Sequence, residues 1–117
     1  MNINLKKAVK HELHTGTTYL KKNDTRKAFH HFERAHILGQ SSPWYHTLAH
    51  LKMLHIALIR RDISEVLGQL IRIPAGFIGS VVGVVPVGNT GGSNVSPFKS
   101  MKIPDDLQDI INSSKEF

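Results

Sequence analysis

Apolar residues recur every three or four positions over the first 73 residues of the chain, which is the spacing of an amphipathic helix. The pattern predicts four helices, over residues 4–22, 25–38, 43–60 and 63–73. Each of the last three follows a residue whose side-chain oxygen can cap free backbone N–H groups: Asp24, Ser42 and Asp62. The third segment is apolar on nearly every side, so we expect this helix at the centre of the fold.

The pattern changes at Pro74, which is expected to end the fourth helix because proline lacks a backbone N–H. The side chains expected to face inward from that helix are Ile63, Val66, Leu67 and Leu70. Residues 74–103 are rich in glycine and small apolar residues, and they predict a strap packed on the helices, either extended or as a short helix. Residues 104–112 predict a short final helix that docks through Leu107, Ile110 and Ile111.

A weak internal repeat relates two of the predicted helix starts. Asp24-Thr-Arg-Lys-Ala-Phe resembles Asp62-Ile-Ser-Glu-Val-Leu, and residues 24 and 62 are 38 positions apart. Helical hairpins of the tetratricopeptide type repeat at about this length. The predicted fold is therefore all-α, with one domain over residues 1–117. Two helical hairpins form a four-helix, tetratricopeptide-like stack, followed by a glycine-rich C-terminal strap and a short terminal helix.

Glu33, His36, His46 and His50 flank the turn between the second and third segments. Because that turn is short, the two helices should run antiparallel, and residues whose numbers share nearly the same sum should lie side by side. The residue numbers of His36 and His46 sum to 82, and those of Glu33 and His50 sum to 83, so the four side chains should converge. Neutral imidazole suits Zn, Cu, Fe or Ni, and a carboxylate offsets their charge. The pattern predicts a site for a divalent or cuprous transition metal, namely Zn, Cu or Fe.

A buried polar network is the alternative for these histidines, with the imidazoles bonded to Glu33, Tyr45 or main-chain carbonyls. Two further side chains are candidate ligands. Glu12 lies on the apolar face of the first segment, where a carboxylate needs an ion-pair partner or a bound cation. Met53, one turn beyond His50, is either a core residue or a soft ligand suited to copper.

Other polar residues are candidates for supporting roles. Arg34 either holds a carboxylate of the site or covers the surface of the hairpin. The loop over residues 88–94 resembles an anion-binding nest, but it lacks the lysine and the following helix of a phosphate loop. We expect a structural loop that closes over the helices, with three side chains bonded to its own backbone: Asn89, Thr90 and Asn94.

Composition removes several classes of chemistry. The chain has 117 residues, no cysteine, eight histidines and a formal net charge of +6. Without cysteine there are no disulfides, thiolate metal sites or cysteine nucleophiles. The basic first segment suits an acidic protein partner, and no motif for specific nucleic-acid recognition is present.

Nothing in the sequence predicts a targeting or membrane-spanning segment. The N-terminus lacks the apolar core of a signal peptide. The apolar stretch after Pro74 is interrupted by glycine and too short to span a membrane alone. We expect a cytoplasmic protein, with a homodimer as a candidate assembly.

Several sequence blocks together resemble a small bacterial family known only as a domain of unknown function. They are Glu33-Arg-Ala-His-Ile-Leu-Gly-Gln40, the His46/His50 pair and Gly88-Asn-Thr-Gly-Gly92. The resemblance implies that the histidine constellation and the glycine loop are shared features. It also implies an association with heavy-metal resistance functions, and it supplies no mechanism.

The leading hypothesis from the sequence is a helical protein for metal handling or sensing, whose ligands are His36, His46, His50 and Glu33. A tetratricopeptide-like protein–protein interaction module with a structural histidine cluster is the alternative. A metal-dependent enzyme comes third, and the sequence identifies no catalytic residue for it.

Overall fold

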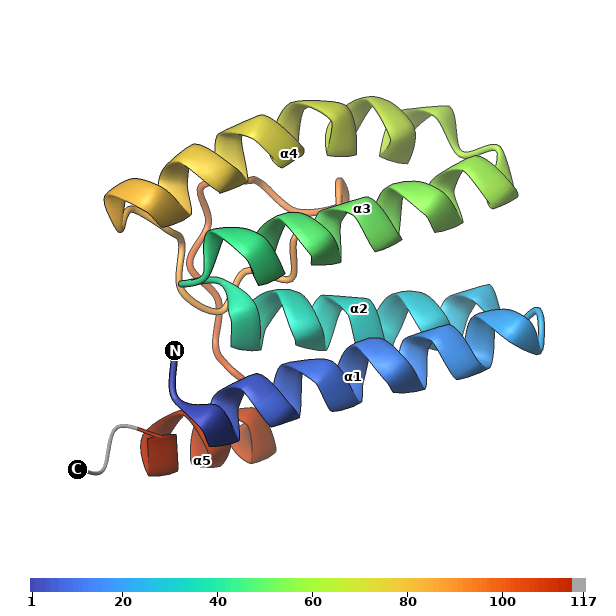
Figure 1. Ribbon diagram of the computed structural model, residues 1–117. Coiled ribbons are helices and arrows are strands. Elements are labelled where there is room, and N and C mark those ends of the chain that lie inside the picture. Colours follow the sequence, from blue (N-terminus) through green and yellow to red (C-terminus); the bar gives the residue numbers. More distant parts are fainter. Residues whose placement is uncertain (115–117) are drawn as a thin grey trace.

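The computed structural model describes residues 1–114 and contains five helices in that range. They are α1 (Ile3–Lys21), α2 (Thr25–Gly39), α3 (Pro43–Arg60), α4 (Ile63–Val82) and α5 (Asp105–Ser114). Figure 1 shows the first four as a row, in which α1 and α2 form one hairpin and α3 and α4 form the next. The all-α prediction with helical hairpins is confirmed.

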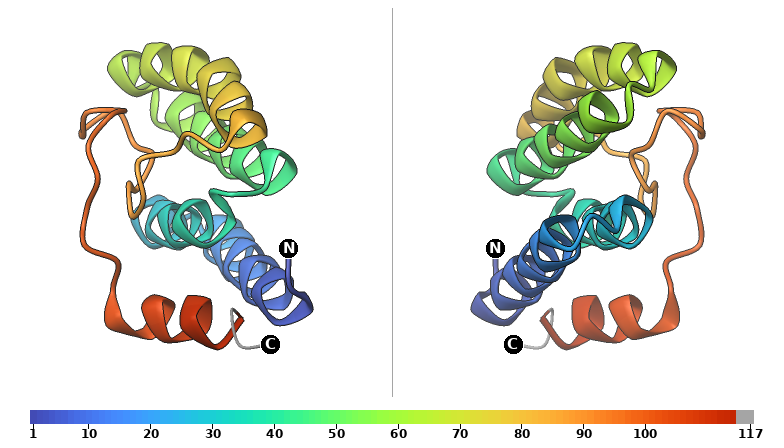
Figure 2. Two further views of the ribbon diagram at one scale, coloured as in Figure 1. Left: turned by 90° about the vertical axis from the view of Figure 1, so that its left-hand side faces the viewer. Right: turned by 90° about the vertical axis from the view of Figure 1, so that its right-hand side faces the viewer.

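The remaining parts of the chain lie along one side of this row. Figure 2 shows the segment between α4 and α5 running past α3 and α2 before α5 reaches the far end of the stack. There α5 packs on α1 and α2, with Leu107 fully buried. The expected strap is therefore present from Gly83 onward, and it connects the two ends of the molecule.

The predicted helix starts are capped as expected. The side chain of Asp24 accepts a hydrogen bond from the backbone N–H of Lys27, and Asp62 accepts one from Glu65, each at 3.1 Å. Ser42 accepts one from Tyr45 at 3.3 Å. Because the turn between α2 and α3 is short, the two helices lie against each other, and this contact positions the candidate site.

The core lies where α1, α2, α3 and α5 meet, and its fully buried side chains include Val9, Phe32, Met53, Ile56 and Leu107. Gly16 allows close packing there, since a Cβ at that position would lie 2.5 Å from Phe32 Cε1. Met53 is thus a core residue, one of the two roles considered for it.

Glu12 is buried at the edge of this core and is fully paired. Its carboxylate accepts hydrogen bonds from Arg34 Nε at 2.9 Å and lies 2.7 Å from His31 Nδ1. Arg34 also bonds to Asp106 of α5. The ion-pair alternative for Glu12 is the one the structure adopts. Arg34 ties α1 to α5, and none of its hydrogen bonds goes to His36, His46 or His50.

The prediction that the fourth helix ends at Pro74 is wrong, because α4 continues to Val82. The helix ends where Gly83 takes a left-handed conformation with φ of +79°. Proline leaves the carbonyl of the residue four positions earlier, Leu70, without its helical partner. Both Pro74 and Leu70 lie on the exposed side of α4, where water can supply that hydrogen bond.

The predicted orientation of α4 is also wrong. Ile63, Leu67 and Leu70 are 72%, 57% and 53% exposed, and Val66 is half-buried. The side chains that α4 buries are polar: Glu65, Gln69 and Ser80. Among the described residues, α4 alone is long and apolar enough to cross a membrane, a test that core helices of soluble proteins also pass.

The third helix is buried on fewer sides than expected. It lies between α2 and α4 (Figure 1), and its inner positions are Tyr45, Ala49, Met53 and Ile56. Trp44 is 69% exposed, however, and Leu58 is 58% exposed. The outer side of α3 therefore faces solvent.

Candidate metal centre

Three predicted ligands meet between the ends of α2 and α3. His36 comes from the last turn of α2, and His46 and His50 come from successive turns of α3. The ring centroids lie 4.6 Å (His36–His46), 4.5 Å (His36–His50) and 5.0 Å (His46–His50) apart. One nitrogen from each ring can be chosen so that all lie within 4.8 Å of one another. All three residues are at least 96% buried.

Each imidazole is anchored through its Nδ1 atom to an oxygen acceptor. His36 Nδ1 lies 2.7 Å from the main-chain oxygen of Asn89, in the loop after α4. His46 Nδ1 lies 2.5 Å from Ser80 Oγ of α4. His50 Nδ1 lies 2.6 Å from Gln69 Oε1, also of α4. In metal sites, hydrogen-bond acceptors of this kind, which contact the ring nitrogen that does not bind the metal, fix the orientation of the imidazole ligands.

The hydrogen-bond directions follow from what each partner can donate. The Asn89 carbonyl can only accept. Ser80 donates its single proton to the main-chain oxygen of Gln40 at 2.6 Å, so it accepts from His46. The Gln69 amide nitrogen donates to Glu65 at 2.7 Å and to the Gly91 carbonyl at 2.9 Å, which leaves its oxygen to accept. All three imidazoles therefore carry their proton on Nδ1.

This arrangement turns the unprotonated Nε2 atoms of His36 and His50 toward each other at a distance of 3.1 Å. Two nitrogens that both lack a proton cannot hydrogen-bond to each other, and a cation between them would satisfy both lone pairs. A tetrahedral ion at 2.0–2.1 Å from each nitrogen would separate its ligands by about 3.3–3.4 Å. The observed spacing is close to that geometry.

Burial keeps the rings neutral. It lowers the pKa of His46 and of His50 to about 4, and the neighbouring histidine adds to the effect on His46. Burial also lowers the pKa of His36 well below its usual value, reinforced by His50 and His46. Neutral imidazole is the form that binds metal ions.

Two glycines allow the surrounding backbone to approach the rings. A Cβ on Gly91 would lie 2.6 Å from His36 Cδ2, and this residue has φ of +87°. A Cβ on Gly76, in α4, would lie 2.9 Å from His46 Nε2. Any larger residue would displace the imidazoles, so these positions favour glycine.

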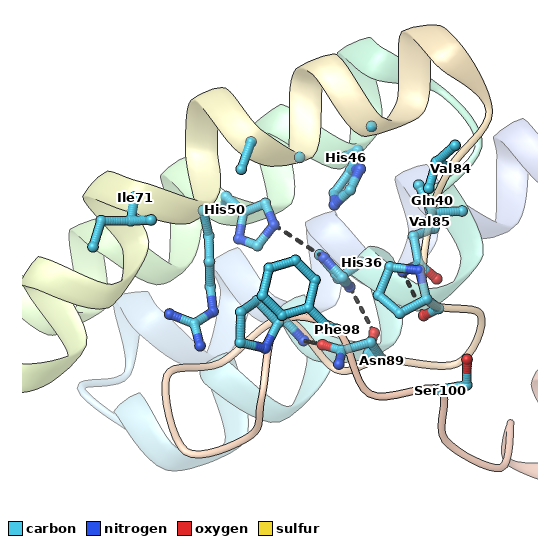
Figure 3. Close-up of a pocket in the computed structure, with 17 residues that line it drawn as sticks. His36, Gln40, His46, His50, Ile71, Val84, Val85, Asn89, Phe98 and Ser100 are labelled. Atoms are coloured by element: carbon cyan, nitrogen blue, oxygen red, sulfur yellow. Dashed lines mark hydrogen bonds between the residues drawn. The ribbon is translucent and has the colours of Figure 1, made fainter.

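A cavity of about 420 Å³ adjoins the three rings. Figure 3 shows the histidines on one side of it, with the loop bearing Asn89 and the segment bearing Phe98 on the other. Arg72 of α4 also lines it, and its guanidinium group donates to the carbonyls of Gly68 and Val95. The cavity leaves room for a further ligand beside the imidazoles.

Glu33 is the predicted ligand that the structure places elsewhere. It is not part of the converging group of His36, His46 and His50. Burial and the negative charge of Glu65 raise its pKa to about 7, and a hydrogen bond with Thr90 works in the opposite direction. Glu33 lies about 60° around α2 from His36, so its side chain leaves the helix in a different direction from the His36 ring. Gln69 of α4 occupies the place beside His50 instead.

The Asn89 side chain bonds to the backbone of its own loop and of the residues that follow, as expected. The Asn89 side chain donates to the carbonyls of Ser96 and Lys99 at 2.8 and 2.7 Å, and it accepts from the Gly91 N–H at 2.8 Å. Thr90 instead acts on Glu33, whose pKa it lowers, and Asn94 is exposed. The loop covers His36 and supplies the carbonyl that orients it.

Sequence reasoning missed the residues that anchor the rings, namely Gln69, Ser80 and the Asn89 carbonyl. A signal for two of them was present, because Glu65, Gln69, Gly76 and Ser80 follow one another at spacings of four and seven. That spacing places small and polar residues on one helical face.

The family comparison agrees with the resemblance noted from the sequence. The model of a family described as a protein of unknown function (DUF3703) matches residues 3–111. No curated protein and no solved structure matches the chain significantly. The match covers almost all of the chain, and the protein therefore belongs to the DUF3703 family of proteins of unknown function.

Proposed function

We propose that this protein binds one transition-metal ion through the Nε2 atoms of His36, His46 and His50. The observation that carries the proposal is the set of three Nδ1 anchors, which leaves the unprotonated Nε2 atoms of His36 and His50 facing each other at 3.1 Å. A structural histidine network would be expected to pair donors with acceptors. Here the inner nitrogens have no proton to share.

The donor set indicates the kind of ion. Three neutral nitrogen ligands suit Zn²⁺, Cu⁺, Cu²⁺ or Fe²⁺, whereas Mg²⁺ and Ca²⁺ prefer oxygen. The role that best fits a buried site of this kind is metal handling or sensing. A metal-dependent enzyme is the second candidate, favoured by the cavity beside the rings, where a fourth ligand such as water has space.

The test is metal binding by the full chain purified without a histidine tag. We expect about one equivalent of metal by elemental analysis and, in competition titrations, a dissociation constant below about 1 μM. The double variant His46→Ala/His50→Ala should lose this binding while circular dichroism shows that the helices remain. His55→Ala is the matched control, because His55 lies exposed on the same helix.

Two results would overturn the proposal. One is that no divalent or cuprous ion binds more tightly than micromolar. The other is that the double variant binds metal as well as the His55→Ala control does.

A further inference from the structure

The outer face of α4 carries an uninterrupted apolar stripe. Its members follow one another at spacings of four, three, four, three and four residues: Ile63, Leu67, Leu70, Pro74, Phe77 and Val81. All six are exposed, and the five nonproline side chains are 48–72% accessible. Figures 1 and 2 show α4 at the edge of the helix row, with no other element over this face. A stripe with this spacing is typical of helices that pack against another helix.

The size of the face is suited to a protein interface. Ile71, Ile78 and Val82 beside it are 61–69% exposed, and together with the stripe they expose on the order of 1,000 Å², most of it apolar. The largest patch on a typical monomer is about 300–600 Å². A stable dimer buries about 800 Å² on each partner.

The face also lacks charge. Between residues 63 and 98 the charged side chains are Glu65 and Arg72. Glu65 lies on the buried side of α4. Arg72 is half-buried and donates hydrogen bonds to the carbonyls of Gly68 and Val95. Two copies can therefore approach each other along the stripe without bringing charged side chains of α4 into contact.

Insertion of α4 across a membrane fits these contacts less well. It would carry Glu65 and Arg72 into hydrocarbon, where charged side chains are costly. It would also break the hydrogen bonds from His46 to Ser80 and from His50 to Gln69. The inner face of α4 is committed to the histidines, so only its outer face is free.

We propose that α4 of one copy packs against α4 of a second copy in a two-fold symmetric homodimer. The same stripe meets itself in such an interface, as closed symmetry requires. This proposal rests on the outer face of α4 alone and does not depend on a bound metal.

The test is the mass of the full chain in solution, measured by sedimentation equilibrium over a range of concentrations. We expect twice the chain mass of 13.1 kDa for the wild type. Leu70→Lys should weaken association at least tenfold. Ile3→Lys is the control, because Ile3 is 65% exposed at the start of α1, and it should leave association unchanged. Circular dichroism confirms that both variants are folded.

A cross-linking experiment locates the interface independently. Because the chain has no cysteine, Leu70→Cys introduces the only thiol, and a short bismaleimide should join two copies through it. Ile3→Cys should give no cross-linked dimer. A monomeric wild type would overturn the proposal, as would a dimer unaffected by Leu70→Lys. So would a monomer that binds vesicles of anionic phospholipid through this face.

Discussion

The Ser80 hydroxyl group determines which nitrogen of His46 faces the site. It donates to the Gln40 carbonyl and accepts the Nδ1 proton of His46. Ser80→Ala would leave a buried N–H without a partner, at a cost of about 1–3 kcal/mol in the free energy of unfolding. Loss of such an anchor should also weaken metal binding about 10–100-fold. Competition titration measures this effect, with the exposed Ser64→Ala as control. Unchanged affinity in Ser80→Ala would show that the anchor has no influence on the ring.

The buried histidines should make the metal-free protein sensitive to acid. In the unfolded chain their pKa is near 6.5, whereas the folded protein lowers it to about 4 for His46 and His50. As the pH falls, the unfolded state therefore takes up protons before the folded state does. The stability linked to the neutral histidines is present above pH 6.5 and is lost as the pH falls through 4. The expected slope is up to about 1.4 kcal/mol per pH unit for each histidine. Urea unfolding at a series of pH values measures the slope, which should be shallower in His46→Gln.

Glu33 should act in the opposite direction. Its pKa is raised from 4.5 to about 7 in the folded protein, so the stability linked to its protonated form is present below pH 4.5 and lost as the pH rises through 7. Glu33→Gln keeps the shape without the charge. We expect this variant to melt at a higher temperature than the wild type at pH 8 and at nearly the same temperature at pH 4. A lower melting temperature at pH 8 would mean that the ionised carboxylate has a stabilising partner.

At the scale of helices, the sequence was sufficient to predict α1, α2 and α3, because apolar residues recur every three or four positions in each of them. It also predicted the caps of α2 and α3, Asp24 and Ser42. It was also sufficient to bring the three histidines together, since the short turn fixes the register between α2 and α3. It failed for α4. That helix has an apolar face and a polar face, and the usual rule turns the apolar face inward.

The polar face of α4 is buried because Gln69 and Ser80 meet histidines that come from another part of the chain. The pattern within one helix cannot reveal such partners. The same reason applies to Asn89, whose contribution is a backbone carbonyl and therefore leaves no mark in the sequence.

Weakening the packing of helix α5 should lower the stability of the fold without affecting the candidate site. Its fully buried anchor is Leu107, and its packing partners are α1 and α2. Leu107→Ala should cost about 2–5 kcal/mol in the free energy of unfolding. Metal affinity should stay as in the wild type, because none of the ring anchors belongs to α5. Asp109→Ala, an exposed change on the same helix, is the control for chemical denaturation. A parallel loss of metal affinity would show that α5 supports the site.

At the scale of the whole molecule, a bound ion should stabilise the fold through linkage, since the unfolded chain has no preformed site. At free metal 100-fold above the dissociation constant, the gain is about 2.7 kcal/mol, or about 10 °C in melting temperature. Scanning calorimetry with and without a chelator measures this shift. The double variant His46→Ala/His50→Ala should show none, and an equal shift in that variant would point to binding elsewhere.

The hydrogen bond between His36 and the Asn89 carbonyl joins positions 53 residues apart in the chain. Since His46 and His50 are likewise held by α4, an ion coordinated at the three rings would cross-link both hairpins and the covering loop at once. Release of such an ion would require imidazoles anchored in separate parts of the chain to give up their shared ligand. The lifetime of the complex would therefore depend on how rigidly those parts are held together.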